Sequence, residues 1–157
     1  MTDAGAPRVR RARPLDLPHV ARLAAEHAAY EKVTTPLPAD LSQRLETLLF
    51  GSAAPRLRCF VAELADGEII GYASCAPELS TWDGAEYLHM DCLFLRNGHR
   101  GLGIGPMLME AVQGEARALG LGQVQWQTPP WNEDAIRFYD RLGARAKEKR
   151  RYFLPVD

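Results

Sequence analysis

A glycine-rich segment has the residue types that bind an anion. The stretch HRGLGIGPMLMEAV, residues 99–112, places Gly101, Gly103 and Gly105 on alternate positions directly before an apolar run typical of a helix. Each glycine costs backbone entropy relative to alanine, so three of them indicate that bare backbone is needed here. The first turn of a helix offers free N–H groups and about half a positive charge, which suits a diphosphate. Together with Arg100, the segment predicts a phosphate-binding helix start, and the alternative is a turn that needs glycines for packing alone.

Two common phosphate loops do not fit this segment. A Walker loop ends in Gly-Lys-Ser or Gly-Lys-Thr, whereas Gly105 is followed by Pro106 and Met107. A dinucleotide fingerprint needs a third glycine where Pro106 stands, and an acidic residue at the end of the next strand, where QWQT has none. The sequence therefore argues against both nucleotide-binding classes.

Two other stretches carry side chains suited to proton transfer. In the predicted strand EYLHMDCLFL, His89 and Asp91 are two positions apart and so share one face. Asp91 is costly to bury without a partner, which could be a substrate ammonium or an arginine. His89 could accept a proton near neutral pH or serve only in packing. In the predicted helix NEDAIRFYDRLGA, Tyr139 lies on the apolar side, either as a reactive hydroxyl or as the edge of a packed helix.

The elements that would position these residues form an α/β chain. Apolar periodicity and turn signals predict the order β-α-α-β-β-β-α-β-α-β, a mixed sheet with helices packed on it. Asp16 and Asn132 are expected to cap helices, Gly51 and Gly143 to end them, and Asp66-Gly67 to form a hairpin turn. The expected strands are RVRRAR, RCFVAEL, EIIGYASCAPEL, EYLHMDCLFL, GQVQWQT and AKEKRRYFLP.

The bulk properties limit the class of protein. At 157 residues the chain suits a single domain, residues 1–157, able to bury about 70% of its unfolded surface. The hydrophobic fraction of 46% and the charged fraction of 25% are typical of a soluble globular protein. A net charge of −1 gives no support for nucleic-acid binding. The basic cluster from Arg8 to Arg13 is predicted to be a solvated edge strand rather than a nucleic-acid arm.

The cysteines and the N-terminal region indicate the compartment. Cys59, Cys75 and Cys92 are odd in number, lie in apolar runs and lack metal-ligand spacing, so reduced core cysteines and no metal site are expected. The first 20 residues contain no apolar signal region, and no apolar run approaches 18 residues. The expectation is a cytoplasmic protein without a membrane partner.

The glycine segment resembles the acetyl-CoA-binding motif of the GCN5-related N-acetyltransferase (GNAT) family. Arg100, Gly103 and Gly105 fill its pattern Gln/Arg-x-x-Gly-x-Gly/Ala. The stretches EHAAYE, ELSTWDG, YLHMD and WNEDAIRFYDRLGA are similar to segments of the diamine (spermidine/spermine) acetyltransferase branch. The resemblance implies the GNAT fold, in which two central parallel strands of a mixed sheet splay apart between flanking helices. It also implies a homodimer.

The same resemblance assigns a binding site for acetyl-CoA, the acetyl donor. The pantetheine arm would lie in the splay against the main chain of DCLFL, and the diphosphate would lie on the glycine segment. Asn132 would bind the donor beside these groups, and Tyr139 would face its sulfur. The donor-binding residues implied are Cys92, Leu93, Phe94, Leu95, Arg100, Gly101, Leu102, Gly103, Ile104, Gly105, Pro106, Asn132 and Tyr139.

Acetyl transfer to an amine poses two proton problems. An ammonium with a pKa of about 10.4 must lose its proton, which costs about 4–5 kcal/mol near pH 7. A tyrosine with a pKa of about 10 can protonate the leaving thiolate, whose acid has a pKa of about 8.5, uphill by only about 2 kcal/mol. We therefore expect Tyr139 to be the general acid and Asp91 to receive the ammonium proton, directly or through water.

The expected acceptor is a small primary amine: a diamine or polyamine, an amino acid with a side-chain amine, or an amino-group antibiotic. Glu31, Trp82, His89 and Asp91 are the candidate substrate-binding residues, although Trp82 could equally be a packing contact. The diamine branch usually has a Glu-Asp pair where this chain has Met90-Asp91, which weakens the case for a polycation. The alternatives are acetylation of a protein lysine or N-terminus, which the long loop APELSTWDGAE disfavours, and a non-catalytic acyl-CoA sensor.

Overall fold

A mixed five-stranded sheet forms the centre of the first of two compact units. The computed structural model describes residues 5–157. This unit ends at Trp126, and residues 127–157 form the second. The strand order is β1-β2-β3-β4-β5, with antiparallel neighbours except for the parallel pair β4 and β5. The predicted mixed sheet with flanking helices is confirmed, while residues 1–4 of the predicted domain lie outside the described residues. The elements of the first unit are β1 Arg8–Arg11, α1 Leu17–Tyr30, α2 Leu41–Phe50, β2 Arg58–Glu63, β3 Ile69–Ser80, β4 Ala85–Leu95, α3 Ile104–Ala118 and β5 Val124–Gln125.

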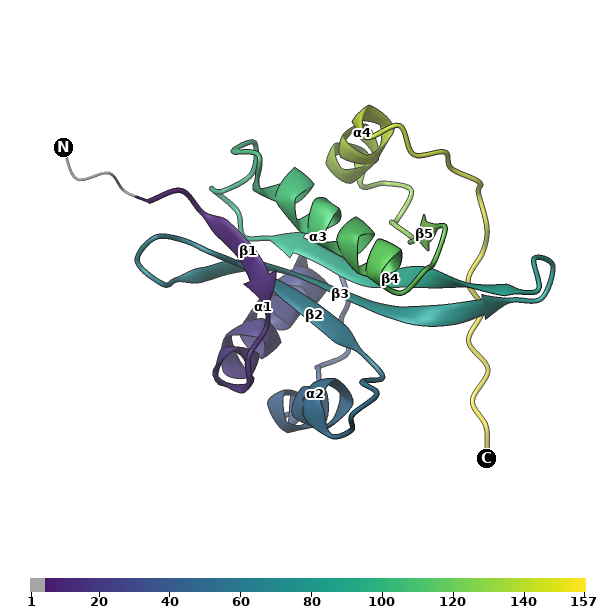
Figure 1. The fold of residues 1–157 in the computed structure, drawn as a ribbon, viewed down its shortest axis with the longest axis horizontal. Coiled ribbons are helices and arrows are strands. Elements are labelled where there is room, and N and C mark those ends of the chain that lie inside the picture. The colour runs from purple at the N-terminus through teal and green to yellow at the C-terminus, as the bar shows by residue number, and fades with distance from the viewer. Residues whose placement is uncertain (1–4) are drawn as a thin grey trace. The chain divides into compact units, whose positions relative to one another are not determined.

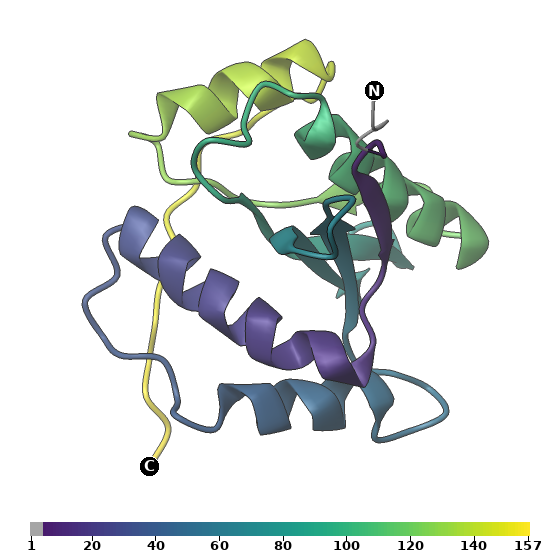
Figure 2. The ribbon, with the colours of Figure 1, turned by 90° about the vertical axis from the view of Figure 1, so that its left-hand side faces the viewer.

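Helices cover both faces of this sheet. Figures 1 and 2 show α1 and α2 on one face and α3 on the other. The apolar positions of each helix recur at three- or four-residue spacing, so each helix buries one side. Leu17, Val20 and Leu23 of α1 join a cluster with Tyr72 and Phe94 of the sheet. On the other face, α3 buries Ile104, Leu108 and Val112.

A β-bulge in β4 occurs at Asp91. Ser74 of β3 pairs with Cys92 and the next residue, Cys75, pairs with Met90, so Asp91 is an extra residue opposite the β3 strand. A bulge breaks the strict alternation of side chains and re-aims the bulged residue. As a result, Asp91 and its neighbour Cys92 lie together, with Cys92 Sγ 3.6 Å from Asp91 Oδ2.

The parallel strands β4 and β5 pair over only two positions. Leu88 pairs with Val124 and His89 pairs with Gln125. Beyond His89, β4 continues to Leu95 without β5, in agreement with the predicted splay. The β5 strand is shorter than the predicted strand GQVQWQT, and the prolines that follow have no N–H group to extend a ladder.

The second unit contains α4, Glu133–Arg141, and the C-terminal residues 142–157. Both predicted helix signals are confirmed: Asn132 Oδ1 accepts a hydrogen bond of 3.3 Å from the N–H of Ala135, and Gly143 has φ +85° after the helix end. The predicted strand AKEKRRYFLP is wrong. Residues 146–155 form no strand, and the Tyr152 and Phe153 side chains are exposed. A segment with β-forming residues becomes a strand only when a neighbouring strand pairs with it. Five of the first six residues of this segment are charged, which disfavours a place in a packed sheet.

The role of Asp16 differs from the sequence prediction. Asp16 does precede α1, but its side chain makes no capping hydrogen bond to that helix. It closes the preceding 3₁₀ turn, Pro14–Asp16, by accepting a 2.7 Å hydrogen bond from the N–H of Arg13, and it pairs with Arg10. The basic β1 strand is at the sheet edge as predicted, yet the Arg10 side chain is mostly buried against Asp16 and Glu63.

No helix within residues 5–157 has the length and apolar character needed to cross a membrane.

Candidate functional site

The glycine segment between β4 and α3 has a left-handed backbone at two positions. Gly101 has φ +82° and Gly103, the N-cap of α3, has φ +80°. L-amino acids rarely adopt such angles, so the turn itself requires glycine at both positions. A Cβ atom built on Gly101 or Gly103 would meet no protein atom within 4 Å. The backbone there is therefore open to a ligand as well as sharply turned.

The N-terminus of α3 fits a diphosphate. This helix has 15 residues and begins directly after the open glycine turn. Its first-turn N–H groups have no carbonyl partner within the helix, and the aligned peptide dipoles favour an anion there. Pro106, in the first turn, contributes no N–H group but suits the geometry of a helix start. The open turn and the helix N-terminus together provide what the predicted diphosphate site needs.

Arg100 connects the glycine segment to the rest of the unit. Its guanidinium carbon lies 4.6 Å from the ring centroid of Tyr30, at the end of α1, and 5.8 Å from that of Phe94 in β4. Its Nε–H donates a 3.2 Å hydrogen bond to the carbonyl of Leu95. A cation over aromatic faces is held electrostatically, so these contacts fix a positive charge beside the glycine turn.

A cavity of about 310 Å³ lies between α1, α2 and the strands β2 to β4. It brings together Glu31 and Asp91, two of the predicted substrate-binding residues that are 60 positions apart in the sequence. Its other polar lining residues are His27, Tyr72 and Ser74. The remaining lining residues are Val20, Ala24, Ala28, Val33, Leu37, Leu41, Leu45, Leu49, Leu57, Cys59 and Cys92.

His27 links two other lining residues of this cavity, Tyr72 and Glu31. Its Nδ1 lies 3.0 Å from the hydroxyl of Tyr72, and its Nε2 lies 2.6 Å from Glu31 Oε2. The imidazole also stacks on Phe94 with 5.1 Å between ring centroids. Sequence reasoning missed His27 and Tyr72. The i, i+4 spacing of His27 and Glu31 on one helix was an available signal, whereas the contact with Tyr72 depends on tertiary packing.

Burial keeps the weak acids of the cavity protonated. It raises the pKa of the Tyr72 phenol well above its usual range, with a further increase from the neighbouring Cys92. It raises the pKa of Cys92 to about 11 and that of Cys59 to about 12. These three groups are therefore neutral hydrogen-bonding partners near pH 7. The negative charge of the cavity comes from the carboxylates Glu31 and Asp91.

His89 and Trp82 lie outside the cavity lining. His89 Nε2 is 3.9 Å from Asp91 Oδ1, so the predicted proximity of these two side chains is confirmed. Trp82 is 97% exposed at the tip of the β3–β4 hairpin. The structure thus brings Glu31 and Asp91 together, sets His89 beside Asp91 and leaves Trp82 apart from them.

The other predicted donor-binding residues lie at the end of β4 and in the second unit. Cys92, Leu93, Phe94 and Leu95 form the end of β4, in the part that β5 does not pair with. In the second unit, Asn132 is buried at the start of α4, and Tyr139 lies in the same helix with its ring 5.4 Å from that of Phe138. Within residues 5–157 no group of three or more His, Cys, Asp or Glu side chains is placed to hold a metal ion.

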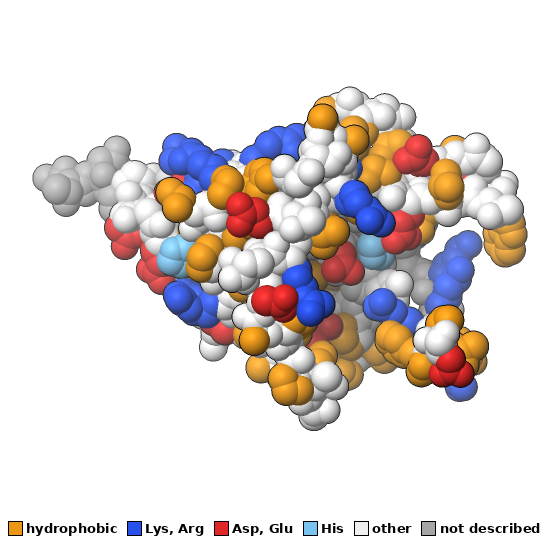
Figure 3. Space-filling view, turned by 90° about the horizontal axis from the view of Figure 1, so that it is seen from below, with side chains coloured by type: hydrophobic (Ala, Val, Ile, Leu, Met, Phe, Trp, Pro, Cys, Tyr) orange, Lys and Arg blue, Asp and Glu red, His pale blue; other side chains and the backbone are white. Residues whose placement is uncertain are grey.

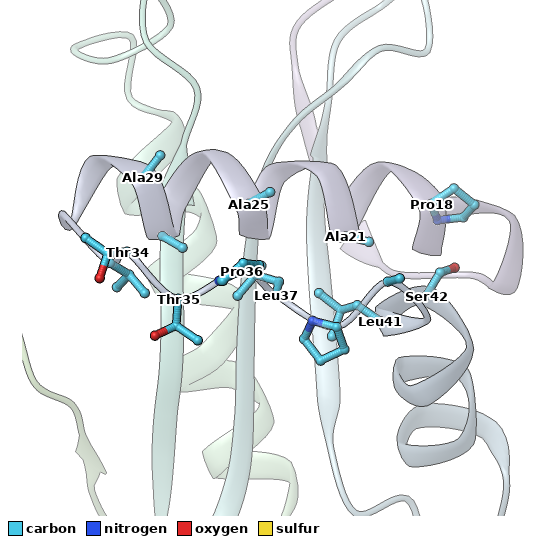
Figure 4. Close-up of a pocket in the computed structure, with 14 residues that line it drawn as sticks. Pro18, Ala21, Ala25, Ala29, Thr34, Thr35, Pro36, Leu37, Leu41 and Ser42 are labelled. Carbon is cyan, nitrogen blue, oxygen red and sulfur yellow. The ribbon is translucent and has the colours of Figure 1, made fainter.

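A second hollow, of about 490 Å³, runs between α1 and the segment that leads to α2. Figure 4 shows Ala21, Ala25 and Ala29 of α1 along it, with Thr35 and Leu37 of the connecting segment. In the part of the chain that the structure describes, no charged side chain lines it. It therefore offers an amine no counter-ion, unlike the cavity that contains Glu31 and Asp91. On the face seen in Figure 3, acidic, basic and apolar side chains are interspersed.

Comparisons with known proteins agree on one family. The model of the Acetyltransferase (GNAT) family matches residues 23–144. A thialysine N-epsilon-acetyltransferase from Bos taurus is 30% identical over 143 residues, which cover 87% of this chain and 82% of the relative. An L-ornithine N5-acetyltransferase from Arabidopsis thaliana is 32% identical over 82 residues. That alignment covers 52% of this chain and only 36% of the relative, so the chain spans about a third of that protein's length.

Solved structures share the fold. The structure of AAC(6')-Iy in complex with the bisubstrate analogue CoA-S-monomethyl-acetylneamine has a TM-score of 0.78, with 98% of this chain and all of that chain covered. The sequence identity to it is 19%, so this similarity concerns the fold alone.

Proposed function

The chain belongs to the acetyltransferase (GNAT) family, and from this premise we propose that it transfers an acetyl group from acetyl-CoA to the primary amine of a small molecule. One observation carries the proposal: the open glycine turn that starts α3 belongs to the same unit as a cavity containing two carboxylates. The first feature suits the donor and the second suits a cationic acceptor. The relatives named above act on small amines, which supports the same acceptor class.

The donor would be held mainly by main-chain groups. We assign its diphosphate to the first-turn N–H groups of α3 and to Arg100, since hydrogen bonds to a charged group contribute roughly 1.5–3 kcal/mol each. The end of β4, Cys92 to Leu95, lacks a β5 partner and so has main-chain groups for the pantetheine arm. Asn132 is the further donor-binding residue of this proposal.

The reaction needs one base and one acid. Asp91, at the bulge, would accept the ammonium proton directly or through a water molecule, which leaves the amine nitrogen with a free electron pair. The nitrogen attacks the thioester carbonyl and the C–N bond forms. Collapse of the tetrahedral intermediate breaks the C–S bond, and the second N–H proton of the attacking nitrogen passes through water to restore the general acid. Tyr139 would give its phenolic proton to the departing thiolate, a transfer that the two pKa values permit.

A thiol-release assay with acetyl-CoA and a panel of primary amines tests this function. Wild-type protein should release CoA with at least one small amine, and Tyr139→Phe should lower kcat about a hundredfold, the usual contribution of a positioned general acid. Tyr152→Phe is the matched control: it removes the same hydroxyl from a side chain that is 83% exposed and keeps the aromatic ring, so kcat should be unchanged. Binding of acetyl-CoA without thiol release for any amine would favour a sensor and contradict the proposal.

The predicted homodimer and cytoplasmic location extend this proposal. The C-terminal residues Tyr152, Phe153, Leu154 and Val156 are all at least 79% exposed, and such an apolar run is better covered by a partner than by water. We therefore propose that this tail binds a second copy of the chain. Light scattering should give a dimer for the full chain and a monomer after removal of residues 152–157. The free, mostly buried cysteines support a reducing compartment.

A further inference from the structure

The lining of the 310 Å³ cavity restricts the acceptor amine. At about 310 Å³ the cavity is at the small end of ligand pockets, which span about 300–1,000 Å³, so it suits a small molecule. Its charged residues, Glu31 and Asp91, come from the end of α1 and from the bulge in β4. The side chains that line the space between them determine what kind of chemical group can be attached to the ammonium group of the acceptor.

Leucines form one wall of the cavity. Five of them line it, from α2 and from the segments on either side of that helix, and they are Leu37, Leu41, Leu45, Leu49 and Leu57. Val20 and Ala24 of α1 add to this apolar surface. An alkyl or aromatic body removed from water against such a wall gains about 25 cal/mol per Å² of buried apolar surface.

Among residues 5–157, no lysine or arginine lines the cavity. The α-carboxylate of an amino acid would enter a space that contains the carboxylates of Glu31 and Asp91 and no lysine or arginine to pair with it. His27, which also lines the cavity, is already bonded to Glu31 and Tyr72. Removing a carboxylate from water without a partner is costly, and like charges add to that cost. This charge pattern disfavours amino-acid acceptors such as those named for the thialysine and ornithine relatives.

A second ammonium group is also poorly accommodated. His27 engages Glu31 Oε2 at 2.6 Å, which leaves the other oxygen of that carboxylate, and the α2 residues that line the cavity within residues 5–157 are leucines. A far ammonium group of a diamine would lose water there without gaining an ion pair. A single ammonium near Asp91 leaves the leucine wall for an uncharged body.

We propose that this cavity binds a primary amine with an apolar body that carries neither a carboxylate nor a second ammonium group. The inference rests on the proposed acetyltransferase function and narrows its acceptor class. It assigns the leucines of α2 and its flanking segments to specificity for the body of the amine, and the carboxylates to its charged head.

Three matched amines test the inference. 1-Aminopentane, 1,5-diaminopentane and lysine share a five-carbon chain and differ by a second ammonium group and then by a carboxylate. The expected order of kcat/KM is 1-aminopentane, then 1,5-diaminopentane, then lysine, with at least about tenfold between the first and the last. The highest value for lysine or for 1,5-diaminopentane would overturn the inference while leaving the acetyltransferase function intact.

A charge placed on the leucine wall provides the second test. Leu41→Glu adds a carboxylate in the first turn of α2, where acidic residues are compatible with a helix start. It should raise kcat/KM for 1,5-diaminopentane relative to 1-aminopentane by about tenfold. The control Leu48→Glu adds the same charge to α2 outside the cavity lining and should leave the ratio unchanged. Equal ratios in the two variants would contradict the proposed location of the amine body.

Calorimetric titration of the same amines separates amine binding in the cavity from acetyl transfer. If no amine supports thiol release, the proposed function fails, and the order of binding affinities still tests the cavity. Tighter binding of 1-aminopentane than of lysine supports the inference. Equal or reversed affinities reject it.

Discussion

His27 Nε2 lies 2.6 Å from Glu31 Oε2, one turn further along α1. In the neutral tautomer protonated at Nε2, Nε2–H donates to the Glu31 carboxylate and Nδ1 accepts from the Tyr72 hydroxyl. The imidazole therefore orients the carboxylate from the side of the protein core. This makes His27 a positioning residue for the cavity.

Loss of His27 should weaken amine binding more than it slows the chemical step. His27→Leu removes the partner that orients Glu31, and we expect KM for the amine to rise about tenfold with kcat reduced less than threefold. His27→Gln keeps a hydrogen-bond donor, so its KM should lie between that of His27→Leu and that of wild type. Steady-state kinetics of both variants check this, and an equal KM effect in the two would show that His27 acts only through packing.

Asp91 should control the pH dependence of the reaction. Asp91→Asn removes the group that accepts the ammonium proton, so kcat/KM near pH 7 should fall about a hundredfold and recover as rising pH deprotonates the free amine. Asp83→Asn, at the exposed hairpin tip, removes a carboxylate of the same type and should behave as wild type. A pH–rate profile of Asp91→Asn parallel to that of wild type would exclude Asp91 as the base.

A side chain at Gly103 should destabilise the protein because of the left-handed backbone conformation at this position. At φ +80°, Gly103→Ala places an L-residue in the left-handed region and should lower the free energy of unfolding by about 1–2 kcal/mol. Gly114→Ala, in the interior of α3 with an ordinary backbone, should instead stabilise the protein by about 0.5–1 kcal/mol. Urea unfolding of both variants checks the contrast, and stabilisation by both would show that the turn differs from the one described.

The ion pair of Asp16 and Arg10 should make stability depend on pH. The Arg10 guanidinium beside Asp16, together with the N–H of Arg13, holds the pKa of this carboxyl below its ordinary value of 3.8. A lowered folded-state pKa gives stability that is present above the unfolded pKa and is lost as pH falls through the folded pKa. Asp16→Asn should therefore cost about 2 kcal/mol at pH 7 and much less near pH 2.

Urea unfolding of Asp16→Asn and wild type at these two pH values measures that difference. Asp40→Asn is the control, because the pair of Asp40 with Arg44 is exposed on α2 and contributes at most about 0.5 kcal/mol. A constant cost of Asp16→Asn between pH 7 and pH 2 would show that the carboxylate charge is not what stabilises this turn.

Local patterns in the sequence predicted most of the fold. The alternating and helical periods located the strands and helices of the sheet unit, and Asn132 and Gly143 marked the ends of α4 correctly. The predicted strand at residues 146–155 failed because a strand depends on a neighbour that no local pattern reveals.

The candidate site was predictable only in part. Glu31 and Asp91 were identified from the sequence, and the structure sets both in one cavity. The bulge at Asp91 comes from the pairing of β3 with β4, and the contact of His27 with Tyr72 joins residues 45 positions apart. Pairing register and long-range contacts arise from the packing of the whole sheet, so single-sequence reasoning did not find them.

Titration calorimetry of CoA and of pantetheine, which lacks the diphosphate and the phosphorylated adenosine of CoA, tests whether the glycine turn binds the diphosphate. If the glycine turn and the first turn of α3 hold the diphosphate, wild-type protein binds CoA much more tightly than pantetheine. Arg100→Ala should then weaken CoA binding about tenfold, through loss of a charge-assisted contact, and leave pantetheine binding unchanged. Equal affinities of wild type for the two ligands, or no heat of binding with CoA, would show that this turn does not bind the diphosphate.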